Sequence, residues 1–227
     1  MRLISFQQIA SSVRLYVADD FIDAREIEDL LRIGAEAENE FRGIDVSRQN
    51  IAADHFVTAK HDVTGFSFEM CREGNCILNA VSSRMEAAFG FANSRGGSMR
   101  FRRYYPGEYH PLHYDNYEIS NHYLIATAMM WLTDTESGGQ TRFPYCAPAP
   151  LVLEPRAGRL AVWLNYGLDG SIDRAAMHEA LPVIRGSKTT LTNFIYGAFD
   201  LVPAFSRGLA RKTGIPGVRF EDVRSEL

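Results

Sequence analysis

The sequence predicts a mainly β protein, in which a double-stranded β-helix (jelly-roll) core is backed by N-terminal helices. Apolar residues recur with a helical period before residue 98, and with a period of two after it. Pro- and Gly-rich turns divide the second part into many short strands. Two stacked sheets covered by helices would bury both kinds of element. We expect one domain over 1–227, with a helical support region at 1–97, the jelly-roll core at 98–199 and a C-terminal extension at 200–227.

The first helix is predicted to follow a short strand at 13–17. Asp23 and Glu26 stand three residues apart, as in a capping box at a helix N-terminus. The next apolar residues share one helical face, and they are Ile27, Leu30, Leu31 and Ala35. This pattern indicates an amphipathic helix whose apolar face packs on the core.

A second helix is predicted to begin near Asn75 and to stop at Gly90. Its apolar stripe consists of Ile77, Val81, Met85, Ala88 and Phe89. Strands begin at Ser98, where Met99 and Phe101 alternate with arginines. A similar apolar run at 160–164 is predicted to be another strand, and the tail beyond residue 200 is predicted to be a solvated extension.

The composition is that of an ordinary globular protein, with 46% hydrophobic and 23% charged residues. A net charge of -4 offers no basic surface for nucleic acid. No apolar run is long enough for a membrane span or a signal peptide. Cys71, Cys76 and Cys146 lack the spacing of a redox or zinc motif, so we expect reduced thiols and a cytoplasmic location. The oligomeric state stays open.

The most informative residues are His113 and Asp115, one residue apart, and the distant His178. Two imidazoles and one carboxylate suit a non-haem iron(II) facial triad, which leaves metal positions for a cosubstrate and oxygen. On a strand, His113, Asp115 and Tyr117 would share one face, and His178 would come from a facing strand. The other reading is that His113 and His178 are unrelated, since an isolated His-x-Asp is common by chance.

Lys188 opens a strand-like stretch in which Lys188, Thr190, Thr192 and Phe194 fall on one face. A cation on an interior face needs an anionic partner, because an unpaired buried charge is costly. A dicarboxylate cosubstrate could bind the metal at one end and Lys188 at the other. The alternative is an exposed lysine at a strand end.

Several spaced motifs together resemble the prolyl 4-hydroxylase branch of the iron(II)/2-oxoglutarate dioxygenases. In chain order they are Arg103-Tyr104, Gly107, His113, Asp115, Thr127-Ala-Met-Met-Trp-Leu132, Gly138-Gly-Gln-Thr-Arg-Phe-Pro144, Asn165, Gly170, Asp173, His178 and Pro182-Val-Ile-Arg-Gly-Ser-Lys188. The resemblance covers about residues 98 to 197. The chain departs from the family pattern at His110, Thr189, Phe194 and Leu124. These departures affect the substrate side and not the ligand set.

The resemblance assigns roles to matching residues. His113, Asp115 and His178 would hold iron, Lys188 and Tyr104 would bind the distal carboxylate of 2-oxoglutarate, and Thr127 would form a wall of the cosubstrate pocket. It implies iron(II), 2-oxoglutarate and O2 as cofactors and cosubstrates, with ascorbate as an optional addition.

The activity implied is hydroxylation of an unactivated C–H, coupled to the conversion of 2-oxoglutarate to succinate. Asp115 favours hydroxylation, or a related oxidation, over halogenation, because halogenating relatives lack this carboxylate. The substrate would be a small molecule, an amino acid or a peptidyl residue such as proline, with Trp131 and Arg142 as candidate contacts and loops 114–121 and 166–174 beside it. The alternatives are an inactive jelly-roll binding or sensor module and a zinc hydrolase.

Overall fold

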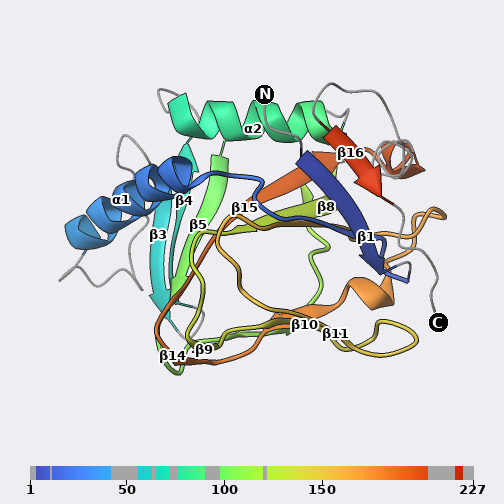
Figure 1. Cartoon of the computed structure of the whole chain (residues 1–227). Helices are drawn as coiled ribbons and strands as arrows, with labels where there is room; N and C mark the ends of the chain where they lie inside the picture. The colour runs from blue at the N-terminus through green and yellow to red at the C-terminus, as the bar shows by residue number, and fades with distance from the viewer. Residues whose placement is uncertain are drawn as a thin grey trace.

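The computed structural model describes residues 4–10, 12–41, 56–62, 65–71, 76–89, 98–119, 122–203 and 218–221. Two facing sheets form its centre, and two helices lie on the outer face of the larger sheet (Figure 1). The helices are α1 (Ala24–Phe41) and α2 (Cys76–Phe89). This arrangement confirms the predicted jelly-roll core backed by helices.

The larger sheet runs in the order β16-β1-β2-β12-β8-β15-β5-β4-β3, with β7 paired to β8. Its strands are β1 (Ile4–Ala10), β2 (Leu15–Ala18), β3 (Phe56–Asp62), β4 (Gly65–Cys71), β5 (Ser98–Tyr104), β7 (Glu118–Ile119), β8 (His122–Trp131), β12 (Leu160–Leu164), β15 (Lys188–Gly197) and β16 (Val218–Glu221). The central strand β8 is buried on both faces, which is why its sequence reads as a nearly continuous apolar run.

The smaller sheet, in the order β11-β10-β13-β6, faces the interior side of the larger one. Its strands are β6 (His110–His113), β10 (Thr141–Phe143), β11 (Leu151–Leu153) and β13 (His178–Ala180), and a short 3-10 helix, Arg174–Ala176, leads into β13. A two-stranded ribbon of β9 (Ser137–Gly138) and β14 (Val183–Arg185) closes one end.

The predicted N-terminus of the first helix is confirmed by its hydrogen bonds. The Glu26 amide donates to the Asp23 side chain at 2.9 Å, and the Asp23 amide donates to Glu26 at 3.0 Å, so the capping box forms. The predicted stop of the second helix, Gly90, lies outside the described residues. Gly34 allows α1 to approach the sheet closely, since a Cβ there would lie 2.2 Å from the ring of Phe101.

The expectation of a mainly helical region over 1–97 is incomplete, because the region contains α1 and α2 but also β1, β2, β3 and β4, which extend the larger sheet at both ends. In β4, Phe66, Phe68 and Met70 are buried and alternate with Ser67 and Glu69. That period of two marks a strand, and the stronger helical patterns on either side obscured it. The expectation of a solvated tail beyond residue 200 is also wrong in part, since β16 pairs with β1 in parallel.

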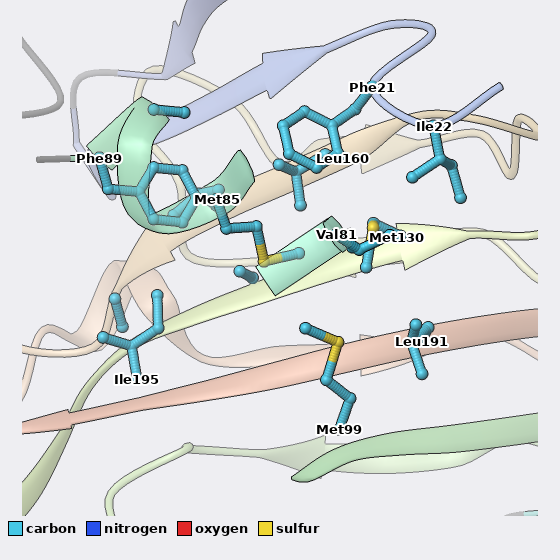
Figure 2. Packing of buried hydrophobic residues seen from close by; sticks show 14 of the residues in the cluster. Phe21, Ile22, Val81, Met85, Phe89, Met99, Met130, Leu160, Leu191 and Ile195 are labelled. Carbon is cyan, nitrogen blue, oxygen red and sulfur yellow. The ribbon is translucent and has the colours of Figure 1, made fainter. Parts of the chain in front are cut away.

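The main hydrophobic core lies between the helices and the outer face of the larger sheet (Figure 2). Leu191 and Ile195 of β15 contribute to it from the face opposite Lys188. A second cluster fills part of the space between the two sheets and includes Trp131, Phe143 and Trp163. Cys146 is a buried free thiol. In the part of the chain that the structure describes, neither helix has the length and hydropathy required to cross a membrane.

Candidate active site

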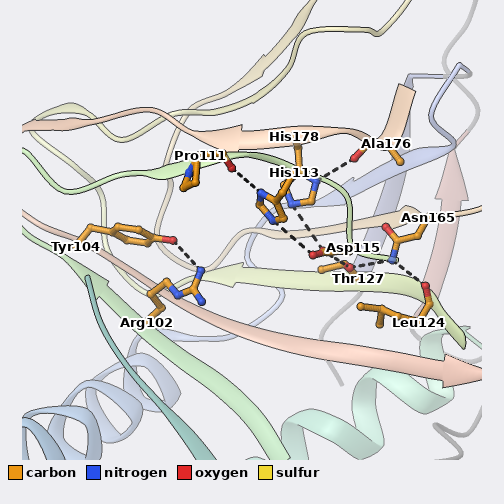
Figure 3. Close-up of polar contacts among 10 residues, drawn as sticks. All are labelled: Arg102, Tyr104, Pro111, His113, Asp115, Leu124, Thr127, Asn165, Ala176 and His178. Carbon is orange, nitrogen blue, oxygen red and sulfur yellow. Dashed lines mark hydrogen bonds and ion pairs between the residues drawn. The ribbon is translucent and has the colours of Figure 1, made fainter. Parts of the chain in front are cut away.

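The structure brings His113, Asp115 and His178 together between the sheets (Figure 3). His113 ends β6 and His178 begins β13, and the two residues are direct partners in the antiparallel ladder. The ligand atoms of all three side chains lie within 4.8 Å of one another. Asp115 was expected to share a strand with His113, but it lies two residues beyond the end of β6, in an irregular segment.

Backbone carbonyls fix the proton positions on both imidazoles. His113 Nδ1 lies 2.7 Å from the Pro111 oxygen, and His178 Nδ1 lies 2.9 Å from the Ala176 oxygen. A carbonyl only accepts, so each Nδ1 donates and each Nε2 keeps its lone pair. The two Nε2 atoms lie 3.5 and 3.7 Å from the oxygens of Asp115. This is the arrangement by which metal-binding histidines are oriented, and the donor set fits iron(II).

A chain of hydrogen bonds orients Asp115. The Thr127 hydroxyl donates to Asp115 Oδ2 at 2.7 Å, and the Asn165 amide donates to the Thr127 oxygen at 3.1 Å. The same amide nitrogen donates to the Leu124 carbonyl at 3.1 Å. Through these hydrogen bonds Thr127 orients Asp115, in addition to the predicted role as a pocket wall. Asn165, which was predicted only as part of a motif, orients Thr127.

Burial and neighbouring charges keep the ligands in the states that bind a cation. Burial lowers the pKa of His178 to about 4, so its imidazole is neutral near neutral pH. Burial by itself raises the pKa of Asp115. The opposing effects come from the imidazoles of His178 and His113 and from the hydroxyl of Thr127, and together they exceed the effect of burial, so the pKa of Asp115 is lowered overall. A neutral imidazole and an ionised carboxylate are the forms that ligate a metal.

Lys188 lies in the same pocket and is 1% exposed. Its ammonium donates to the Thr141 hydroxyl at 3.2 Å and lies 5.3 Å from the centre of the Tyr104 ring. Burial, together with the charge of Arg102, lowers the pKa of Lys188 to about 7. The predicted interior face is confirmed, because Lys188, Thr190, Thr192 and Phe194 all line the pocket. The alternative of an exposed strand-end lysine is wrong.

Tyr104 is the register partner of Lys188 on β5. Its hydroxyl accepts a hydrogen bond from Arg102 at 3.3 Å, and burial raises its pKa. Because the ring is buried beside the ammonium, the neutral phenol can add a second donor for an anion bound at Lys188. This placement agrees with the predicted carboxylate-binding role, which stays a proposal.

Two predicted substrate contacts do not line this pocket in the described part of the chain. Trp131 is fully buried in the cluster between the sheets, and Arg142 pairs with Glu179 at 2.7 Å. Their strand faces explain the difference, because Arg142 points to the opposite side of β10 from Thr141. Tyr117, by contrast, does line the pocket and is 58% exposed.

Two arginines and a histidine are among the pocket residues to which the sequence analysis assigned no catalytic or binding role. Arg100 and Arg102 alternate with the core residues of β5 and line the pocket, and His110 lies against His113 with ring centres 4.1 Å apart. The alternation in β5 was visible from the sequence. However, it does not show which face of the strand meets a cavity and which meets solvent.

Residues 99–196 match the family model described as the 2OG-Fe(II) oxygenase superfamily. The chain is similar to this superfamily over that range. The matched range contains all three candidate ligands and Lys188, so the part of the chain that is similar to the superfamily is the part that builds the pocket.

The proteins that are similar to this chain include plant proteins named as prolyl 4-hydroxylases. Probable prolyl 4-hydroxylase 7 of Arabidopsis thaliana is 26% identical over 159 residues, which cover 61% of this chain and 48% of that protein. Probable prolyl 4-hydroxylase 9 of the same plant is 28% identical over 182 residues, or 73% of this chain and 57% of that protein. The chain thus spans about half the length of the curated relatives it matches.

Solved structures share the fold of this chain. The viral collagen prolyl hydroxylase of Paramecium Bursaria Chlorella virus-1, in its complex with 2OG, has a TM-score of 0.61 at 16% identity, and the match covers 81% of this chain and 96% of that one. A prolyl-4-hydroxylase of Pseudomonas putida has a TM-score of 0.50 at 19% identity, covering 80% of this chain and 91% of that one. At these identities the likeness shows a common fold.

Proposed function

We propose that this protein is an iron(II)/2-oxoglutarate-dependent dioxygenase that hydroxylates an unactivated C–H bond. The observation that carries the proposal is one pocket with a His-Asp-His cluster and a buried ammonium, Lys188. A zinc hydrolase would use the three ligands but leave this buried ammonium without a role.

The overall reaction consumes one 2-oxoglutarate and one O2 for each substrate C–H. One oxygen atom enters the substrate as a hydroxyl group, and the other enters succinate as 2-oxoglutarate loses carbon dioxide. Iron(II), when bound, supplies the redox chemistry of oxygen activation and decarboxylation. His113, Asp115 and His178 would hold the iron, and Thr127 fixes the orientation of the carboxylate.

Lys188 and Tyr104 would bind the distal carboxylate of 2-oxoglutarate and so set the direction in which it reaches the metal. Lys188 has no carboxylate partner among the ion pairs of the described residues, so the cosubstrate would supply its counter-charge. Trp163 and Met129 line the pocket with apolar surface, which limits the water around the reacting groups.

The substrate is proposed to be a small molecule, a free amino acid or a peptidyl residue, with proline as one candidate. The plant relatives and the viral neighbour are named as prolyl hydroxylases, which supports the proline candidate. The ordinary composition and the free Cys146 thiol favour a cytoplasmic setting.

The test is succinate release and oxygen uptake by the purified protein with iron(II) and 2-oxoglutarate. We expect the wild type to turn over and His178→Ala to lose at least about 100-fold in the rate of succinate release, because the variant lacks one of the three metal ligands. Arg142→Ala, which removes a polar side chain on the other face of the small sheet, serves as the control and should keep its activity. Iron and 2-oxoglutarate binding without succinate would instead indicate an inactive binding module. Wild-type rates in His178→Ala would refute the ligand assignment.

A further inference from the structure

Asp115 is the candidate metal ligand that does not belong to a strand. It lies in the segment 114–117, which follows β6 and is irregular. Hydrogen bonds from β8 attach this segment at two points. The Thr127 hydroxyl donates to Asp115 Oδ2 at 2.7 Å, and the Leu124 amide donates to the Tyr117 carbonyl at 2.9 Å. The position of the carboxylate therefore depends on what fixes Leu124 and Thr127.

The side-chain amide of Asn165 contacts both of these β8 residues (Figure 3). Its Nδ2 atom donates to the Leu124 carbonyl at 3.1 Å and to the Thr127 oxygen at 3.1 Å. Asn165 is buried and directly follows β12, and its backbone N–H continues the ladder with a bond to the Ile125 carbonyl at 3.0 Å. Its side chain then supplies the donor for the next carbonyl, so a single NH2 group serves both the strand and the metal site.

The orientation of the Asn165 amide is fixed by its neighbours. A backbone carbonyl only accepts hydrogen bonds, so the atom that faces Leu124 must be the nitrogen and not the oxygen. The Oδ1 atom is buried and has no hydrogen-bond partner among the described residues. An unpaired buried acceptor destabilises a fold, so an amide at this position needs a reason. The two hydrogen bonds that its nitrogen donates provide that reason.

The Asn165 amide in turn fixes the direction of the Thr127 hydroxyl. The Thr127 oxygen accepts an N–H of Asn165, so its own proton points to Asp115, whose carboxylate can only accept. A hydroxyl proton rotates to suit its surroundings, and without the N–H on its other side the Thr127 hydroxyl would be free to turn away from Asp115. The hydrogen bond that orients the carboxylate is therefore set by Asn165.

We propose that Asn165 is a positioning residue for the metal, and that it acts through the Thr127 hydroxyl to hold Asp115 in the orientation that binds iron(II). The proposal rests on the proposed dioxygenase function, because that function places the metal at Asp115. It gives a part in metal binding to a residue that is not among those lining the pocket.

The first measurement is the Kd of Mn(II), which takes the place of iron, by calorimetry on metal-free protein. We expect Asn165→Leu to raise this Kd about three- to tenfold, which is the effect of one lost hydrogen bond. Asn165→Asp should raise it about tenfold or more, because its carboxylate competes with Asp115 for the Thr127 proton. Aspartate has the shape of asparagine, so this variant keeps the test open if Asn165→Leu does not fold.

The wild type separates the two proposals. If the wild type binds Mn(II) and the folded Asn165 variants bind it equally well, the role of Asn165 is overturned, although the proposed dioxygenase function stands. A wild type that does not bind Mn(II) would overturn both.

The second measurement separates an action through Thr127 from a general loosening of the fold. The Kd of Mn(II) is compared among Thr127→Val, Asn165→Leu and the variant that carries both changes. If the amide acts through the hydroxyl, Asn165→Leu should change the Kd by less than about twofold once the hydroxyl is gone. Losses that simply multiply in the double variant would show a role independent of Thr127 and would overturn the proposal.

Asn193→Leu is the matched control, because Asn193 is another buried asparagine of the larger sheet, and its Nδ2 atom donates to the Met85 sulfur of α2 at 3.6 Å. Its thermal unfolding in a chelator reports the loss of a buried amide, whereas its Kd for Mn(II) should equal that of the wild type. A Kd raised as much as in Asn165→Leu would show that any buried defect in the sheet weakens the site, and it would overturn the proposal.

Discussion

Replacing Lys188 with Met is expected to stabilise the metal-free protein while it strongly weakens cosubstrate binding. Lys188 is 1% exposed, and its ammonium donates a hydrogen bond to the Thr141 hydroxyl. Burial is the main cause that lowers its pKa from 10.5 to about 7. The unfolded chain therefore binds more protons than the folded one between these two pH values, so wild-type stability rises with pH across this window.

The magnitude follows from the two pKa values. Keeping Lys188 in the fold costs about 4 kcal/mol near pH 7 and about 2 kcal/mol at pH 9. Methionine has a similar length and removes this cost, but it leaves the Thr141 hydroxyl without its donor, a loss of about 1 kcal/mol. The variant should gain about 3 kcal/mol near pH 7 and about 1 kcal/mol at pH 9. For a domain of this size the first value corresponds to a rise in Tm of roughly 6 to 12 °C.

The assay is thermal unfolding at pH 7 and pH 9, in a chelator for the metal-free protein and, in separate samples without chelator, with Mn(II) in the presence and absence of 2-oxoglutarate. Arg185→Met is the control, since it removes an exposed cation that is paired with Glu136, and its Tm should hardly change. With Mn(II) present, 2-oxoglutarate should raise the Tm of the wild type and leave that of Lys188→Met nearly unchanged. A variant that unfolds below the wild type at pH 7, or a gain that does not shrink at pH 9, would show that the ammonium is not strained by burial.

Three further changes test other parts of the structure. Thr127→Val removes the hydroxyl that donates to Asp115 at 2.7 Å and should weaken metal binding by about 10- to 100-fold in calorimetry, with an unchanged Kd as the contrary result. The Kd of 2-oxoglutarate should rise above pH 7, by up to about tenfold per unit, because the free pocket loses the Lys188 proton there; a flat profile to pH 9 would speak against this ion pair. Gly34→Ala should lower stability by about 1 kcal/mol in urea unfolding, because the overlap with Phe101 outweighs the gain in helix propensity; a more stable variant would show that the ring moves aside freely.

The metal cluster could be predicted because it depends on residue types and on their spacing in the sequence. His113 and Asp115 are close in sequence, and His178 and Lys188 could be identified because each lies in a motif that follows in the expected order along the chain. Their convergence then follows from the antiparallel pairing of β6 with β13 and of β5 with β15. The capping box of Asp23 and Glu26 is similarly local, and it was found for the same reason.

The errors arise where the outcome depends on distant partners. Of the N-terminal strands, β2 pairs with β12 and β4 pairs with β5, which lie later in the chain, and the local pattern alone did not reveal them. Arg102 and Arg142 both alternate with buried residues in strands, yet only Arg102 lines the pocket. The difference is set by which face of each strand meets the other sheet, and no single strand contains that information.

The two ends of the proposed cosubstrate site lie on different sheets, so the geometry of the site depends on the distance between the two sheets. The histidine ligands belong to the smaller sheet and Lys188 to the larger one. The packing that sets this spacing surrounds His178, whose ring centre lies 4.8 Å from that of Trp163 and 5.4 Å from that of Phe143. A dicarboxylate has a limited length, and it can bind a metal and an ammonium together only at the correct separation. The aromatic contacts between the sheets therefore act on cosubstrate binding by placing one sheet relative to the other, without touching the ligand's distal carboxylate.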